Sequence, residues 1–104
     1  MTEPIFEEEH GRDLDRVGHY VGVNWQRGLL AFNNVPMSLN EFMDAKGILD
    51  PGDCLGPFAV REEALAWRGK VAVFFQKYMK QRDKTGINAP MVATLMDLFE
   101  RNMI

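Results

Sequence analysis

The segment at residues 61–84 is the longest part of the sequence that reads consistently as one element. Its apolar residues recur at spacings of three and four, which places them on one face of an α-helix. The stripe consists of Ala64, Trp67, Val71, Phe74 and Tyr78, and it is widened by Leu65, Ala72, Phe75 and Met79. A stripe this wide needs cover from more than one other element. The sequence therefore predicts a long amphipathic helix around which the rest of the chain packs.

The two ends of this predicted helix carry charges that suit a helix dipole. Glu62 and Glu63 stand in the first turn, and basic residues gather in the last turns. Gly86 follows and can adopt the left-handed conformation that ends a helix. Gly69 lies inside the helix, where a glycine costs about 1 kcal/mol relative to alanine. It predicts that another backbone passes close by, or that the helix bends.

The side chains of residues 17–25 alternate between a mainly apolar set and a set of glycines and polar residues. This period of two is typical of a strand with one buried face. Arg27 and Gly28 then predict a tight turn into a second strand, Leu29–Phe32, so that the two strands form a hairpin. A short helix over residues 25–32 is the alternative.

Three residues of the first strand carry further information. Gly18 and Gly22 weaken the strand and indicate a bulge or the close approach of another backbone. His19 lies on the apolar side of the strand. We interpret it as a packing histidine rather than a metal ligand, because no second ligand stands at a suitable spacing.

The clearest local signature is the pair Ser38 and Glu41, which has the spacing of a capping box. Gly47 stands where a helix C-terminus favours glycine. The sequence therefore predicts a short helix, Leu39–Lys46. Asp50 to Asp53, with Pro51 and Gly52 between them, predict a type II turn.

The remainder of the chain predicts one more strand and one more helix. Residues 57–60 indicate a brief strand that leads into the long helix. Asn88 can cap a C-terminal helix whose early Pro90 is tolerated in the first turn. Its apolar stripe would contain Met91, Leu95, Leu98 and Phe99. A short connection makes this helix an expected antiparallel neighbour of the long one.

These elements predict a small α+β fold in the order β-β-α-β-α-α, in which an antiparallel sheet packs against one long and two shorter helices. A chain of 104 residues forms one domain. We expect residues 1–16 to form an acidic, mobile or loosely docked arm, and residues 17–104 to form the globular domain.

Composition excludes several classes of protein. An apolar content of 46% with mixed charges argues against global disorder. There is no apolar run of about 18 residues, and the acidic N-terminus does not resemble a signal peptide. One cysteine, Cys54, excludes an internal disulfide, and the cytoplasm of the producing or host cell is the expected location. Since no catalytic, metal or phosphate-loop motif is present, we expect a protein that is not an enzyme and needs no cofactor.

The net charge of −3 hides an uneven distribution. Residues 1–16 carry six acidic and two basic residues, whereas residues 61–84 carry seven basic and three acidic residues. Two candidate partner surfaces follow. One is a basic ridge on the long helix, formed by Lys70, Lys77, Lys80, Arg82 and Lys84, and the other is the acidic arm with Glu7, Glu8 and Glu9.

The sequence also contains seven methionines and eleven aromatic residues, which are adaptable contact groups at interfaces. We therefore expect a small protein-binding module whose partner is another protein or complex. A phage or mobile-element inhibitor that occludes or bridges a host protein is one such module. The alternative is a nucleic-acid-associated accessory protein that uses the basic ridge. No membrane partner is expected, and a homo-oligomer stays open.

Overall fold

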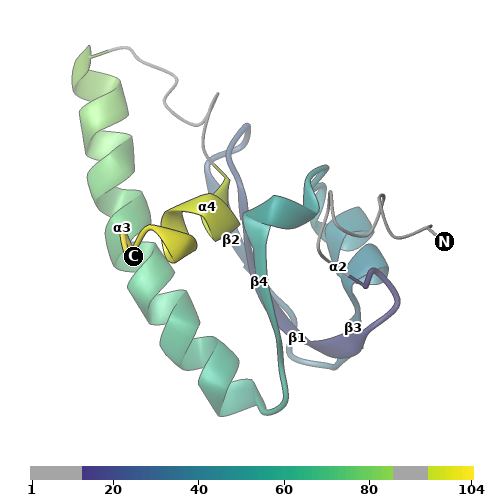
Figure 1. Cartoon of the computed structure of the whole chain (residues 1–104). Helices are drawn as coiled ribbons and strands as arrows, with labels where there is room; N and C mark the ends of the chain where they lie inside the picture. The colour runs from purple at the N-terminus through teal and green to yellow at the C-terminus, as the bar shows by residue number, and fades with distance from the viewer. Residues whose placement is uncertain (1–12, 86–93) are drawn as a thin grey trace, which may run out of the picture.

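The computed structural model describes residues 13–85 and 94–104. Its elements follow in the order β1 (Val17–Asn24), β2 (Leu29–Phe32), β3 (Met37–Ser38), α2 (Leu39–Lys46), the 3-10 turn η1 (Pro51–Asp53), β4 (Cys54–Phe58), α3 (Arg61–Thr85) and α4 (Leu95–Glu100). Figure 1 shows the small sheet with α3 along one side of it. The predicted α+β class is confirmed. The sheet also contains a two-residue strand, β3, that the sequence did not predict.

Strand β1 is the centre of the sheet, because β2, β3 and β4 all pair with it in antiparallel orientation. Strand β2 pairs with the C-terminal half of β1, where Asn24 lies opposite Leu29. Strand β3 pairs with the first two residues of β1, and β4 pairs with its middle, where Gly22 lies opposite Cys54. Residues 21 and 22 pair with both β2 and β4, so these two strands flank β1 on opposite edges.

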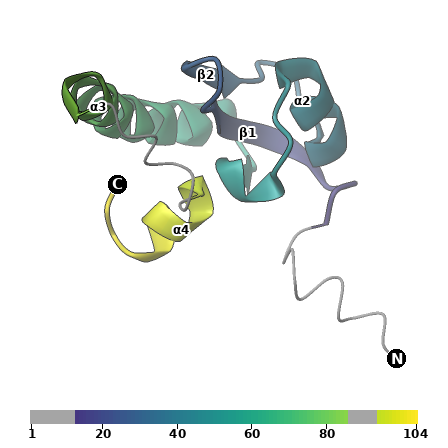
Figure 2. The same ribbon diagram turned by 90° about the horizontal axis from the view of Figure 1, so that it is seen from above.

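Helices cover both faces of β1 (Figure 2). Val21 and Val23 belong to a cluster with residues of α3 and α4. Tyr20 belongs to a second cluster with residues of α2, in which its ring stacks on Phe42 with centroids 5.6 Å apart. The predicted alternation is correct, but the prediction of one buried face is wrong. Residues 18–24 are all buried, because α2 covers the side of β1 that the pattern left open.

The two glycines of β1 are required by close neighbours. A Cβ atom added to Gly18 would lie 2.5 Å from Pro57 Cβ, and one added to Gly22 would lie 2.7 Å from Ile48 Cδ1. The pairing with β4 also shifts register between His19 and Val21. Backbone atoms are also near, since the same added Cβ atoms would lie 3.3 Å from Phe58 O and 3.2 Å from Asp53 O. The predicted bulge and the close approach of another backbone are both confirmed.

The hairpin is confirmed with a longer loop than predicted. Four residues, 25–28, connect β1 to β2, and Gly28 adopts a φ of 69°. The Asn24 side chain holds the loop, because its Oδ1 accepts a hydrogen bond of 3.0 Å from Arg27 N. The alternative of a short helix over residues 25–32 is wrong.

Helices α2 and α3 lie where the sequence predicts them. The Ser38 side chain accepts from Glu41 N, the Glu41 side chain accepts from Ser38 N, and Gly47 ends α2 with a φ of 69°. In α3, the predicted stripe faces the sheet with Ala64, Val71 and Phe75 buried. Gly69 is the exception. It faces open space, so the predicted close approach of another backbone is wrong.

Two predictions for the segment between α2 and α3 need correction. The strand predicted at 57–60 begins earlier, at Cys54, because Cys54 and Leu55 are buried beside β1. The type II turn at residues 50–53 is a 3-10 turn, in which the Asp50 side chain accepts a hydrogen bond of 2.8 Å from Gly52 N. Gly52 lacks the positive φ of a type II turn and lies close to Thr94.

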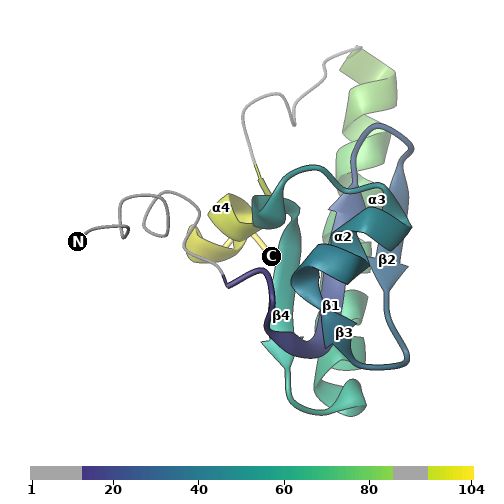
Figure 3. The same ribbon diagram turned by 90° about the vertical axis from the view of Figure 1, so that its right-hand side faces the viewer.

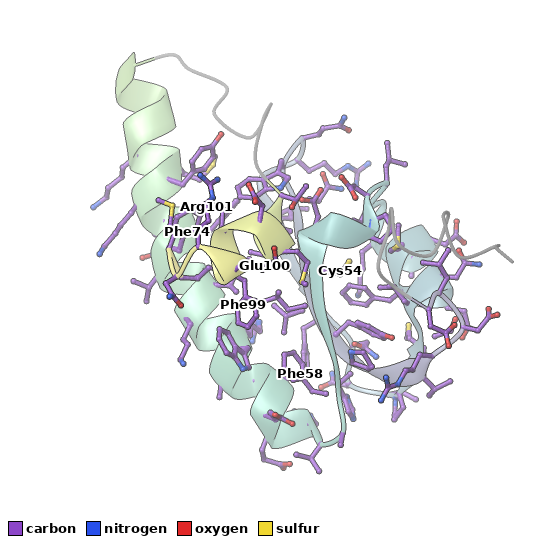
Figure 4. The ribbon with its side chains drawn as sticks, in the orientation of Figure 1. Cys54, Phe58, Phe74, Phe99, Glu100 and Arg101 are labelled. Atoms are coloured by element: carbon purple, nitrogen blue, oxygen red, sulfur yellow. The ribbon has the colours of Figure 1, made fainter. Side chains whose placement is uncertain are left out.

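The C-terminal helix α4 begins at Leu95, where the Thr94 side chain accepts from Asp97 N. The predicted cap Asn88 and Pro90 lie outside the described residues. Helix α4 crosses α3 instead of running alongside it (Figure 1), and it contacts the long helix through an edge-to-face pair of Trp67 and Phe99 at 5.0 Å. Figure 4 places Phe58 and Phe99 between α3 and β4.

Buried polar groups hydrogen-bond the connection between β2 and β3 to β1. Asn33 is 3% exposed, and its side chain accepts from Tyr20 N at 2.6 Å and donates to Gly18 O at 2.9 Å. His19 Nδ1 donates to Asn33 O at 3.0 Å, and its ring stacks on Phe32. His19 is therefore the packing histidine that the sequence predicts.

The described part of the N-terminal arm contacts the domain through Leu14 and through Arg16, whose carbonyl oxygen accepts a hydrogen bond of 2.6 Å from the Tyr20 hydroxyl. Leu14 packs against the cluster under α2, and its carbonyl accepts from Asn40 N at 2.9 Å. Residues 1–12 lie outside the described residues. None of the helices in the described ranges has the length and apolar character that crossing a membrane requires.

Candidate functional site: a basic groove beside strand β2

A groove of about 410 Å³ runs along the outer edge of β2. Three consecutive residues of the strand, Leu30, Ala31 and Phe32, line it. Consecutive strand residues point to opposite faces of a sheet. A groove that touches all three therefore follows the backbone edge of β2, and this edge faces away from β1. We call it the β2 groove.

The two walls of the β2 groove come from helices on opposite faces of the sheet. Lys46, in the last turn of α2, forms one wall, and Arg61, Leu65 and Arg68 of α3 form the other. Figure 3 shows this arrangement, with β2 as the outer strand, α2 in front of the sheet and α3 behind it. The volume of the β2 groove falls within the roughly 300–1,000 Å³ that is usual for ligand pockets.

The β2 groove is basic. Of the described residues that line it, Lys46, Arg61 and Arg68 are cationic and none is acidic. Arg61 Nε donates a hydrogen bond of 3.0 Å to Asn34 Oδ1, and the guanidinium carbon of Arg68 lies 6.0 Å from the centre of the Phe32 ring. These contacts orient the two arginines while leaving their charges unpaired by any carboxylate in the described part of the chain.

The backbone that carries Lys46 is held in place by the hairpin. Asn24 Nδ2 donates to the carbonyl oxygens of Lys46 and Gly47 at 3.2 and 3.1 Å. Because Asn24 also caps the hairpin loop, the end of α2 and the end of β1 form one unit. The wall at Lys46 therefore keeps its position relative to the edge of β2.

The predicted basic ridge lies elsewhere on α3. At 100° per residue, Lys70 and Lys77 project from the helix nearly opposite to Arg61 and Arg68. The side chains of Lys70, Lys77 and Lys80 are all exposed, and Lys70 Nζ lies 4.3 Å from the centre of the Trp67 ring. The side chains of Arg82 and Lys84, and the acidic residues Glu7, Glu8 and Glu9, lie outside the described residues. Of the ridge residues whose side chains the structure describes, Lys70, Lys77 and Lys80, none lines the groove.

The sequence contained a partial signal for the groove. Arg61, Leu65 and Arg68 follow one another at spacings of four and three, so they share one flank of α3. The predicted ridge followed Lys70 and Lys77, which project nearly opposite to this flank, so it did not include Arg61 and Arg68. The contribution of Lys46 and the edge of β2 depends on tertiary packing.

A second polar feature lies at the opposite edge of the sheet. Asp53 Oδ1 accepts hydrogen bonds from Trp25 Nε1 at 2.9 Å and from Leu95 N at 3.4 Å. Burial raises the pKa of Asp53 above its ordinary value, and the charge of Asp50 adds to this, whereas the two hydrogen bonds oppose it. Trp25 lies in the hairpin loop, and Leu95 is the first residue of α4. The Asp53 carboxylate therefore joins the hairpin loop to α4.

Two residues considered for chemistry lie away from the β2 groove. Cys54 is fully buried at the start of β4, and His19 is buried beneath Phe32. Neither lines the groove. Within residues 13–85 and 94–104, no group of three or more histidine, cysteine, aspartate or glutamate side chains is arranged to hold a metal ion.

In comparisons with protein-family models, curated proteins and solved structures, none matches this chain.

Proposed function

We propose that the protein is a small protein-binding module and that the β2 groove is its contact surface. The observation that supports this proposal is a strand edge that no described strand pairs with, with cations on both sides of it that form no ion pair within the described residues. An open strand edge offers backbone hydrogen-bonding groups, and natural proteins usually cover or protect such edges. A partner that fills the groove satisfies these groups and pairs with the cations.

The position of the groove also suits binding to another protein. The exposed Leu29 side chain, 54% accessible, extends the apolar surface beside the strand. Apolar surface surrounded by polar and charged groups is the usual composition of a protein interface. Binding at this edge would occlude the bound part of the partner, which is the action that we expect of an inhibitory module.

The test is affinity capture from a native cell lysate with three forms of the full chain, followed by quantitative mass spectrometry. The groove variant carries Arg61→Glu and Arg68→Glu. The control variant carries Lys77→Glu and Lys80→Glu, which changes the charge equally on the other side of the same helix. A partner at the groove is enriched by the wild type and the control and is lost from the groove variant. Equal capture by all three forms contradicts the proposed contact surface.

Nucleic acid binding through the basic ridge is the second candidate function. It is favoured by Lys77 and Lys80, which are exposed and form no ion pair with the described residues. Binding to labelled DNA and RNA oligonucleotides should then weaken steeply as salt is added, and Lys77→Glu with Lys80→Glu should abolish it. Failure to bind at low salt excludes this function.

A further inference from the structure

We propose that the β2 groove takes an extended, acidic segment of a partner protein, which adds to the sheet as a new strand beside β2. This inference rests on the proposed protein-binding function and deepens it, because it specifies the conformation and the charge of the segment that binds.

The open edge of β2 supports an added strand. Among the described residues, β2 pairs only with β1 and forms the end of the sheet. In such a strand, alternate residues direct their N–H and C=O groups away from the sheet. The four residues of β2 span about 13 Å, so a bound segment pairs over three or four residues. Strand addition of this kind is an established mode of peptide recognition.

The walls of the groove determine which side chains the added strand carries. Alternate side chains of a strand on β2 point toward α2 and toward α3. A carboxylate on the first side meets Lys46, and a carboxylate on the second side meets Arg61 and Arg68. Leu30 and Leu65 give the groove an apolar part, which suits an apolar residue between the acidic ones. The predicted segment is therefore acidic with interspersed apolar residues.

Two other occupants fit less well. A second copy that paired through its own β2 would bring two sets of Lys46, Arg61 and Arg68 together, and like charges in contact oppose association. A nucleic acid would match the cations but would leave the strand edge without backbone partners. The Phe32 ring, on which a base could stack, already carries the Arg68 guanidinium.

The experiment measures binding of a labelled nonapeptide to the full chain by fluorescence anisotropy. The peptide repeats the sequence glutamate, glutamate, valine three times, so that carboxylates point to both sides of the extended strand. Two control peptides are matched to it: one has lysine in place of each glutamate, and one is N-methylated at every residue, so it keeps its charges but has no backbone N–H donors. Binding of the acidic peptide, with loss for both controls, is the expected result. Because these comparisons use the wild-type chain, they do not depend on a variant that folds.

Protein variants and NMR locate the binding site. We expect Arg61→Gln with Arg68→Gln to weaken binding of the acidic peptide about tenfold at low salt. We expect Lys77→Gln with Lys80→Gln to change it less than about twofold, as both are outside the groove. Amide chemical shifts in residues 30–32 should move when the peptide is added. Circular dichroism checks that each variant is folded.

The outcomes are distinct. Equal binding of the N-methylated peptide overturns strand addition, since the groove would then attract only charge. A single-stranded oligonucleotide that displaces the peptide and binds more tightly also overturns it, as does a dimer of the chain through β2 that excludes the peptide. If the acidic peptide fails while a captured protein still depends on Arg61 and Arg68, the protein-binding function stands and only the strand-addition inference is wrong.

Discussion

The indole Nε1–H of Trp25 donates a hydrogen bond of 2.9 Å to Oδ1 of Asp53, and this contact joins two segments 28 positions apart. The Trp25 ring also packs edge-on against Tyr78 of α3, with centroids 5.2 Å apart. The same carboxylate oxygen accepts from Leu95 N. Hairpin loop, 3-10 turn, long helix and C-terminal helix therefore meet around one tryptophan and one carboxylate.

Replacing this carboxylate should change how stability depends on pH. The pKa of Asp53 is raised from 3.8 by burial, so between pH 3.8 and the raised value the folded chain holds a proton that the unfolded chain releases. The free energy of unfolding that Asp53 contributes therefore falls as the pH rises through this window. Asp53→Asn keeps an acceptor for Trp25 and removes the titration.

Urea unfolding of both proteins from about pH 3 to pH 8 measures this effect. We expect the variant to gain stability relative to the wild type as the pH rises through the window, and the difference to become constant above it. A difference that stays the same at every pH would mean that the environment of Asp53 does not favour the protonated form.

Asn33 should contribute more to stability than its neighbour Asn34. Asn33→Ala leaves Tyr20 N–H and Gly18 C=O without their side-chain partner in a buried site, which should cost about 2–4 kcal/mol. Asn34 is exposed and bonds to Arg61, so Asn34→Ala should cost less than about 0.5 kcal/mol. Chemical denaturation of the two variants measures both values, and equal costs would contradict the role assigned to Asn33.

Alanine should have opposite effects at two glycines. At Gly69, a Cβ atom meets nothing within 4 Å, so Gly69→Ala should stabilise the chain by about 1 kcal/mol through helix propensity. At Gly22, the new Cβ would lie 2.7 Å from Ile48 Cδ1 and 3.0 Å from Phe42 Cε2, so Gly22→Ala should destabilise it. Melting temperatures should move in opposite directions, and a fall for Gly69→Ala would contradict the exposed helical site.

Adjacent aromatic residues of α3 should differ in the cost of their removal. Phe75 is 8% exposed and packs in the cluster over β1, so Phe75→Ala should cost about 3–5 kcal/mol. Phe74 is only partly buried, and Phe74→Ala should cost clearly less. Thermal unfolding of both variants makes the comparison, and it is contradicted if Phe74→Ala is the more damaging.

The sequence predicted α2 and the start of α3 well because these limits are determined locally. Ser38 and Glu41 form their capping box within one turn, and Gly47 ends the same helix. The start of α3 at Arg61 is likewise indicated by the apolar period and by acidic residues nearby. These interactions involve residues a few positions apart, so the sequence alone contains them.

Features that depend on distant contacts were predicted poorly. Strand β4 contains Gly56 and Pro57, two residue types that are typical of turns. The segment is nevertheless a strand, because it pairs with β1. The burial of both faces of β1 follows from the packing of α2 on Tyr20, which the period of two does not express. The β2 groove combines residues from three separate elements, so only the spacing of its α3 residues could have been read from the sequence.

The position of β1 has a consequence for how the chain opens. Its backbone pairs with β3 at its start, with β4 in its middle and with β2 in its C-terminal half. Its side chains are covered by helices on both faces. No local fluctuation can expose its inner amides to water without separating most of the other elements. Amide hydrogen exchange in the middle of β1 should therefore report global unfolding, whereas the open edge of β2 should exchange through smaller openings.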